Sequence, residues 1–81
     1  MRNVRKKQTN EENVKGRVVL YGNRHAIVEG CKGVVDYSEE FLKLDLGKLV
    51  LKINGRDLVI ESYVYEELEL KGEIVSVEFM N

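Results

Sequence analysis

Apolar and polar side chains alternate along much of this 81-residue chain. Leu42 and Leu44 flank Lys43, and the same period of two recurs over residues 49–53 and 67–71. Because successive side chains of a β-strand point to opposite faces of the sheet, the alternation places apolar groups on one face and charges on the other. The pattern therefore predicts a small β domain whose surfaces are suited to packing and pairing.

Length and composition favour one globular domain in a reducing compartment. Hydrophobic residues make up 43% and charged residues 33% of the chain, as in folded proteins and unlike disordered or membrane-spanning ones. Residues 4–14 are polar, so we expect no secretory signal and no membrane span. The single Cys31 cannot form a disulfide within the chain. We therefore expect a cytoplasmic protein in which Cys31 is a small buried or half-buried side chain.

Turn signals divide the chain into about eight short strands. Gly22–Asn23 and Asn54–Gly55 have the composition of two-residue hairpin turns, and Gly47 and Gly72 mark further reversals. The expected strands are residues 17–21, 25–30, 33–38, 41–46, 48–53, 57–62, 66–71 and 73–79. Residues 39–43 could instead form a short helical turn. This spacing predicts an all-β antiparallel meander, folded as a small sandwich or roll.

The domain is expected over residues 16–81, after a flexible basic N-terminal tail over residues 1–15. The tail carries five basic and two acidic side chains, whereas the domain carries eight basic and twelve acidic ones. An acidic domain disfavours a nucleic-acid-binding surface on the fold. The residues expected in the core are Leu20, Val28, Val35, Leu42, Leu44, Leu51, Leu58, Ile60, Leu68, Leu70 and Val77.

Few side chains could perform chemistry. His25 and Cys31 are the only residues of their types, and no third group that would orient them as a nucleophilic pair is recognisable. A zinc site needs about four nitrogen or sulfur ligands, and this chain offers only His25 and Cys31. Glu67 and Glu69 share one face of an alternating strand and Glu66 points the other way, which is typical of a solvated face. We therefore predict no catalytic, cofactor-binding or metal-binding residues, and no enzyme.

Two kinds of binding stay open. The four tyrosines, Tyr21, Tyr37, Tyr63 and Tyr65, could stack on bases as in a small nucleic-acid-binding β-barrel, although few basic residues are interleaved with them. Protein contact is favoured instead, because several predicted strands, such as residues 18–20, are apolar on both faces. We expect self-association or docking on a partner, with the final strand as a candidate sheet edge.

The order of the motifs resembles a known family. Tyr21-Gly22-Asn23, then residues 33–37, then residues 55–60, then Gly72-Glu73-Ile74 form a collinear series over residues 17–79. This series is similar to the YabP/YqfC family of sporulation proteins, and most of all to its YqfC branch. Residues 14–16 depart from the family pattern, in which a proline often precedes the first strand.

The resemblance implies a function that composition does not. Members of this family are small proteins of endospore-forming bacteria, required for sporulation and without an assigned enzymatic activity. The resemblance therefore implies a structural or assembly role in the mother cell while the spore envelope forms. It also implies a protein partner, a larger membrane-associated sporulation protein encoded alongside, and no cofactor.

Overall fold

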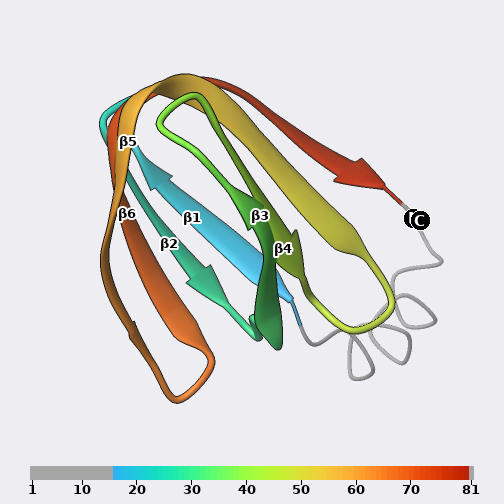
Figure 1. The fold of residues 1–81 in the computed structure, drawn as a ribbon. Helices are drawn as coiled ribbons and strands as arrows, with labels where there is room; N and C mark the ends of the chain where they lie inside the picture. The colour runs from blue at the N-terminus through green and yellow to red at the C-terminus, as the bar shows by residue number, and fades with distance from the viewer. Residues whose placement is uncertain (1–15, 81) are drawn as a thin grey trace, which may run out of the picture.

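The computed structural model describes residues 16–80 (Figure 1), and every regular element within them is a β-strand. The six strands are β1 (Arg17–Tyr21), β2 (His25–Glu29), β3 (Gly33–Tyr37), β4 (Phe41–Asp45), β5 (Val50–Val64) and β6 (Glu67–Met80). The predicted all-β class is confirmed. The helical turn considered for residues 39–43 is not formed, because β4 begins at Phe41. The tail predicted over residues 1–15 lies outside the described residues.

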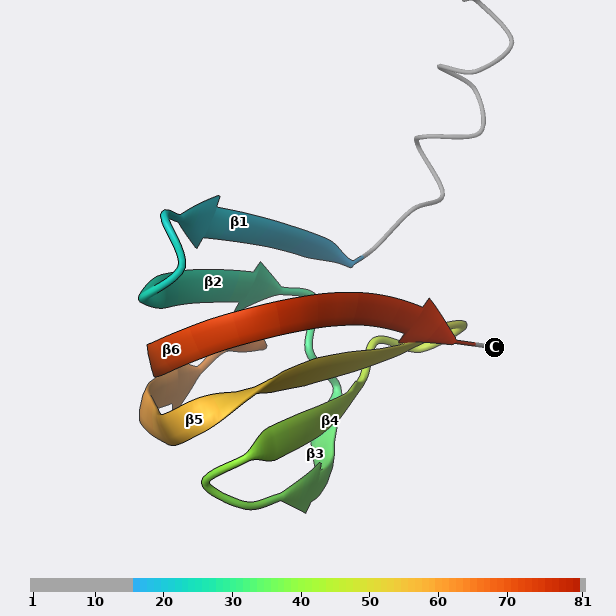
Figure 2. The ribbon, with the colours of Figure 1, turned by 90° about the horizontal axis from the view of Figure 1, so that it is seen from above.

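All six strands join one antiparallel sheet in the order β1-β2-β6-β5-β4-β3 (Figure 2). The expected antiparallel pairing is confirmed, but the expected meander is interrupted, because β2 pairs with β6 and not with β3. Residues 30–32 carry the chain from β2 to the opposite end of the sheet. Two backbone hydrogen bonds fix this crossing: Cys31 N donates to Glu66 O at 2.9 Å, and Lys32 N donates to Asp45 O at 2.7 Å.

Two expected reversals are bends inside long strands, which is why six strands replace the expected eight. Asn54–Gly55 lies within β5 and Gly72 within β6, and the two strands stay paired on both sides of these points. Bulges shift their register between Asn54 and Gly55 and again before Val59. Figure 1 shows the two paired strands arching together over the top of the molecule. The hairpin turn predicted at Asn54–Gly55 is therefore wrong, and its glycine makes a corner instead.

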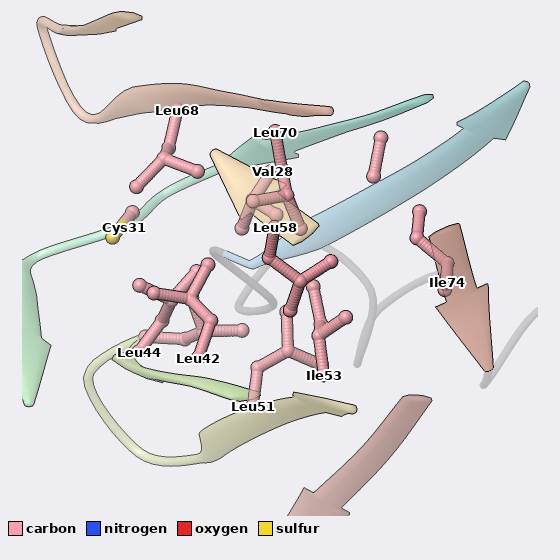
Figure 3. Close-up of a cluster of buried hydrophobic side chains, with 12 residues drawn as sticks. Val28, Cys31, Leu42, Leu44, Leu51, Ile53, Leu58, Leu68, Leu70 and Ile74 are labelled. Atoms are coloured by element: carbon pink, nitrogen blue, oxygen red, sulfur yellow. The ribbon is translucent and has the colours of Figure 1, made fainter. Parts of the chain in front are cut away.

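This bend folds the sheet into two layers that face each other across the core. The first layer consists of β1, β2, residues 67–71 of β6 and residues 59–64 of β5. The second layer consists of residues 74–80 of β6, residues 50–54 of β5, β4 and β3. Figure 3 shows leucines from both layers pointing toward one another. The buried residues are Ala26, Val28, Cys31, Leu42, Leu44, Leu46, Leu51, Ile53, Leu58, Leu68, Leu70 and Ile74.

Most of the predicted core is confirmed. The residues that were both predicted and found buried are Val28, Leu42, Leu44, Leu51, Leu58, Leu68 and Leu70. Ile60 and Val77 are partly buried and pack against this cluster. Cys31 is buried as expected. The prediction omitted four core residues, which are Ala26, Leu46, Ile53 and Ile74.

Two predicted core residues lie at the periphery. Leu20 is opposite Ala26 and shares its inward face, but β1 is the outermost strand of its layer and Leu20 stays 48% exposed. Val35 is 57% exposed: its neighbour Val34 pairs with the inward Leu44, and the register shift between Val34 and Asp36 leaves Val35 as a bulged residue. Both errors lie on edge strands, where Leu20 has the expected face but no covering layer, and Val35 lies outside the regular alternation.

The β5–β6 hairpin turns on two residues with a left-handed backbone. Tyr65 has a φ of 53° and Glu66 a φ of 64°, and Val64 pairs with Glu67 directly across them. A two-residue turn of this kind favours Asn-Gly, because positive φ is costly for most other side chains. The turn is therefore held by the pairing of its long strands and not by its own sequence.

Replacing Tyr65 by Asn is expected to stabilise the protein by about 0.5–1 kcal/mol. The Tyr65 side chain is 96% exposed, so little packing is lost, and Asn adopts positive φ more readily. Urea unfolding measures the gain. Tyr65→Ala is the matched control, since it also removes the ring without favouring positive φ. An equal gain in both variants would contradict a backbone origin.

Candidate functional site

His25 begins β2 on the outer face of the first layer. Its Nε2 lies 2.6 Å from Oε2 of Glu69 on the neighbouring β6. The ring of Tyr21 stacks on the imidazole, with 5.2 Å between the ring centroids. These two contacts orient the histidine along the sheet surface and engage its Nε2 with a carboxylate.

Cys31 lies on the other side of the sheet from His25. It follows β2, is fully buried in the core, and its Sγ donates a weak hydrogen bond to Gly33 O at 3.5 Å. The length of β2 adds about 13 Å between its first and last residues. The structure therefore does not bring together the one histidine and the one thiol that could have formed a nucleophilic pair.

Ionisation of Tyr63 is expected to destabilise the protein above about pH 10. Its hydroxyl donates to Cys31 O at 2.9 Å. A side-chain hydrogen bond with Cys31, followed by partial burial, raises the pKa of Tyr63 from its ordinary value. Because the folded pKa is the higher one, this stabilisation is complete below the unfolded pKa and is lost as pH rises through the folded pKa. Urea unfolding across this range should show a steeper loss for the wild type than for Tyr63→Phe. Parallel losses would contradict a role for this hydroxyl.

The acidic side chains of the described strands and turns lie on solvated surfaces or in ion pairs. Glu67 and Glu69 point outward from β6, and Glu66 in the hairpin turn lies 3.2 Å from Lys32 Nζ. Within residues 16–80, no three His, Cys, Asp or Glu side chains are grouped to hold a metal ion. The same residues include no helix with the length and apolar character of a membrane span.

The four tyrosines are dispersed over the molecule. Tyr37 donates to Leu58 O at 3.3 Å and accepts a hydrogen bond from Ile60 N, so it links β3 to β5. Tyr63 binds the connection after β2, Tyr21 stacks on the outer face, and Tyr65 stands at a hairpin tip. This placement offers no common platform for stacked bases.

The clearest candidate site is an open sheet edge formed by residues 75–80 of β6, called the β6 edge below. Among the described residues, β2 pairs with β6 only over residues 67–71, while β5 occupies the other side of the strand. The edge begins after Ile74, whose N donates to Asn23 O at 2.7 Å. Val75 and Phe79 are 63% and 55% exposed. An unpaired strand with exposed apolar side chains is a template for pairing with another chain.

The two outer strands of the sheet are better protected. On β3, the bulge at Val35 breaks the regular row of backbone groups, and Tyr37 reaches across to β5. On β1, the strand is five residues long and begins with Arg17, which lies 3.8 Å from Glu29. Short, charged or bulged strands resist unwanted pairing. The β6 edge begins with the bulged residue Val75, and its regular part, residues 76–80, carries one charge, Glu78.

Comparison with known proteins places the sequence in a family. The sequence model of the YabP family matches residues 12–81. This chain belongs to the YabP family. A curated relative, the uncharacterized protein YqfC of Bacillus subtilis (strain 168), is 30% identical over 64 residues, which are 79% of this chain and 69% of the relative. The resemblance found in the motifs is thus confirmed. No solved structure matches the chain.

Sequence reasoning anticipated part of the site in this YabP-family protein. The sequence indicates the final strand as a candidate sheet edge, and within residues 16–80 the segment 75–80 of β6 pairs with β5 alone. The sequence does not predict the bulge in β6. This bulge makes Val75 an extra residue and points Ile74 into the core. Gly72 was the available signal, because an isolated glycine within an apolar strand pattern often marks a bulge or bend.

Proposed function

We propose that this YabP-family protein is a non-catalytic assembly factor of endospore formation that acts by binding other proteins. Membership of the family suggests a role related to sporulation. The observation that supports binding is the β6 edge, with its unpaired backbone and the exposed side chains of Val75 and Phe79. An edge of this kind adds a strand from another chain, so its main-chain groups supply affinity and its side chains specificity.

The proposed place of action is the mother-cell cytoplasm during assembly of the spore envelope. One proposed partner is a membrane-associated sporulation protein encoded beside this gene, which would bring the chain to the forespore membrane. The state of the reactive side chains supports a role without catalysis. The imidazole of His25 contacts a carboxylate, the thiol of Cys31 is buried, and the hydroxyl of Tyr63 binds a backbone carbonyl.

Deleting the gene from an endospore former and counting heat-resistant spores tests the proposal. The yield is expected to fall, and wild type and His25→Ala should both restore it. Val75→Asp combined with Phe79→Asp should fail to restore it, although the variant accumulates and folds. Leu20→Asp combined with Val35→Asp is the matched control, because it adds the same two charges at similarly exposed positions on β1 and β3.

Two results would refute the proposal. Normal spore yield without the gene, in a strain lacking a second copy, would remove the role in sporulation. Failure of His25→Ala to restore sporulation, with the folded protein present at normal level, would favour chemistry at His25 over assembly.

A further inference from the structure

We infer that Tyr37 closes one of two equivalent sheet edges and thereby leaves the β6 edge as the open one. The closed edge is formed by residues 58–64 of β5 and is called the β5 edge below. This inference rests on the proposed function and deepens it, since it names the residue that confines strand addition to a single edge. An internal symmetry of the sheet relates the two edges.

The sheet consists of two matching units, β1-β2-β6 and β3-β4-β5. In the first unit, β2 pairs with residues 67–71 of β6, and in the second, β4 pairs with residues 50–54 of β5. Both pairings are antiparallel. β1 lies outside β2 as β3 lies outside β4, and β5 and β6 pair with each other at the centre. An approximate twofold axis between β5 and β6 therefore exchanges the two units.

The bends of the two long strands are held in the same way, by hydrogen bonds to the carbonyls of a turn. The bend of β6 donates to the turn between β1 and β2, and the bend of β5 donates to the turn between β3 and β4. The bonds are Gly72 N to Arg24 O at 3.2 Å, Ile74 N to Asn23 O at 2.7 Å, Gly55 N to Glu40 O at 2.9 Å and Leu58 N to Glu39 O at 2.9 Å. Leu58 is thus the counterpart of Ile74, and both are buried.

The two outer strands also repeat in sequence. Residues 18–21 of β1 are Val-Val-Leu-Tyr, and residues 34–37 of β3 are Val-Val-Asp-Tyr. Tyr21 and Tyr37 are the last residues of their strands. The two tyrosines are therefore equivalent both in sequence and in their place in the sheet.

A bulge gives the two tyrosines different orientations. In β1, Tyr21 pairs with His25 and stacks on its ring on the outer face. In β3, the bulge at Val35 shifts the register by one residue, so that Tyr37 pairs with the buried Leu42. Paired residues point to the same face of a sheet, so Tyr37 turns toward the space between the layers and Tyr21 does not.

The Tyr37 hydroxyl occupies the backbone of the β5 edge. β4 pairs only with residues 50–54 of β5, so no described strand other than β6 pairs with residues 58–64. The hydroxyl donates to Leu58 O at 3.3 Å and accepts a hydrogen bond from Ile60 N at 3.2 Å. Backbone groups that an added strand would need are thus already bonded.

The counterpart of Ile60 on the β6 edge is Val77. Both side chains are partly buried and pack against the core cluster. Ile60 pairs with Leu70 on β6, and Val77 pairs with Ile53 on β5. Leu70 also pairs with β2 and Ile53 with β4, which makes these two partners equivalent.

The Val77 amide points away from β5. Gly55 N donates to Glu40 O, so Gly55 directs its N–H to the side of β5 where β4 lies. Successive residues of a strand direct their peptide groups to opposite sides. Asn54 therefore directs its groups to β6, and its partner Ser76 directs them back to β5. Val77, the next residue, directs its N–H to the free side of the β6 edge.

Amide hydrogen exchange of the purified full chain in dilute solution, followed by nuclear magnetic resonance, tests this inference. After correction for intrinsic rates, the Ile60 amide of the wild type should exchange more slowly than the Val77 amide by about threefold or more. Tyr37→Phe keeps the ring but removes the hydroxyl, and should speed exchange at Ile60 by a similar factor. Tyr21→Phe is the matched control, because it makes the same change at the equivalent position and should leave Ile60 unaffected.

Exchange at Leu44, in the core strand β4, reports any loss of global stability in each variant. An acceleration at Ile60 that Leu44 matches would be a global effect and would overturn the inference. Equal exchange at Ile60 in the wild type and Tyr37→Phe, or a Val77 amide as protected as that of Ile60, would overturn it too. Spore counts are independent of these rates, so a failure at Tyr37 is distinguishable from a failed role in sporulation.

Discussion

Gly55→Ala is expected to lower the free energy of unfolding by about 4 kcal/mol or more, which is enough to unfold a domain of this size. A Cβ at residue 55 would lie 2.0 Å from Glu73 O and 2.9 Å from a methyl carbon of Leu58. The leucine side chain can move, but the backbone oxygen belongs to the paired strand at the bend. The new methyl group must therefore separate β5 from β6 where the sheet folds into two layers. Urea unfolding followed by far-ultraviolet circular dichroism measures the loss.

Two other glycines serve as controls. They distinguish a clash of the added Cβ with neighbouring atoms from the cost of an unfavourable backbone conformation. Gly33 has no atom within 4 Å of an added Cβ, so Gly33→Ala should change stability by less than about 0.5 kcal/mol. Gly22 has a φ of 65° in open space, and Gly22→Ala should cost about 1 kcal/mol from the backbone alone. If Gly22→Ala were as damaging as Gly55→Ala, contact across the bend would not be the cause.

Alternation predicted the faces of the strands well because it is a local property. Leu42 and Leu44 are buried on either side of half-buried Lys43, and Leu68 and Leu70 are buried on either side of Glu69. The covalent geometry of a strand fixes this relation whichever strand becomes its neighbour. The same rule predicted the chemistry of the outer surface, where Glu67 and Glu69 lie on one solvated face.

The topology could not be predicted, because it depends on contacts between distant residues. Asn54–Gly55 has the composition of a hairpin turn, and only the partners of the flanking segments show that it is a corner. Residues 50–54 and residues 59–64 do not pair with each other, since both pair with β6. Likewise β2 and β3 are neighbours along the chain but not in the sheet, because pairing with Leu68 and Leu70 buries Val28 and Ala26.

The sequence predicts which residues form the candidate site but not how their side chains are arranged. Simple alternation over the predicted strand of residues 73–79 would place Val75, Val77 and Phe79 on one face. The bulge at Val75 changes that relation, so that Ile74 is buried, Val77 is partly buried, and Val75 is exposed. Nothing in residues 73–79 alone indicates the bulge, because the bulge accommodates the bend of the paired strand β5.

Leu44→Ala and Leu20→Ala are expected to differ by at least about 1 kcal/mol, although alternation predicted both leucines in the core. Leu44 is fully buried between the layers, so its truncation removes apolar burial and leaves a cavity, at a cost of about 2–5 kcal/mol. Leu20 remains 48% exposed on the outermost strand, and surrounding water can fill the space, so Leu20→Ala should cost less than about 1 kcal/mol.

Urea unfolding of the two variants under the same conditions measures this difference, provided that the free energy of unfolding depends on urea concentration with the same slope in both. Both substitutions remove the same atoms from a leucine on a β-strand, so intrinsic strand propensity cancels in the comparison. The difference then reports only how completely the opposite layer covers each side chain. Equal losses would mean that β1 is covered in solution, and a covered β1 would contradict the layer arrangement from which the β6 edge is left open.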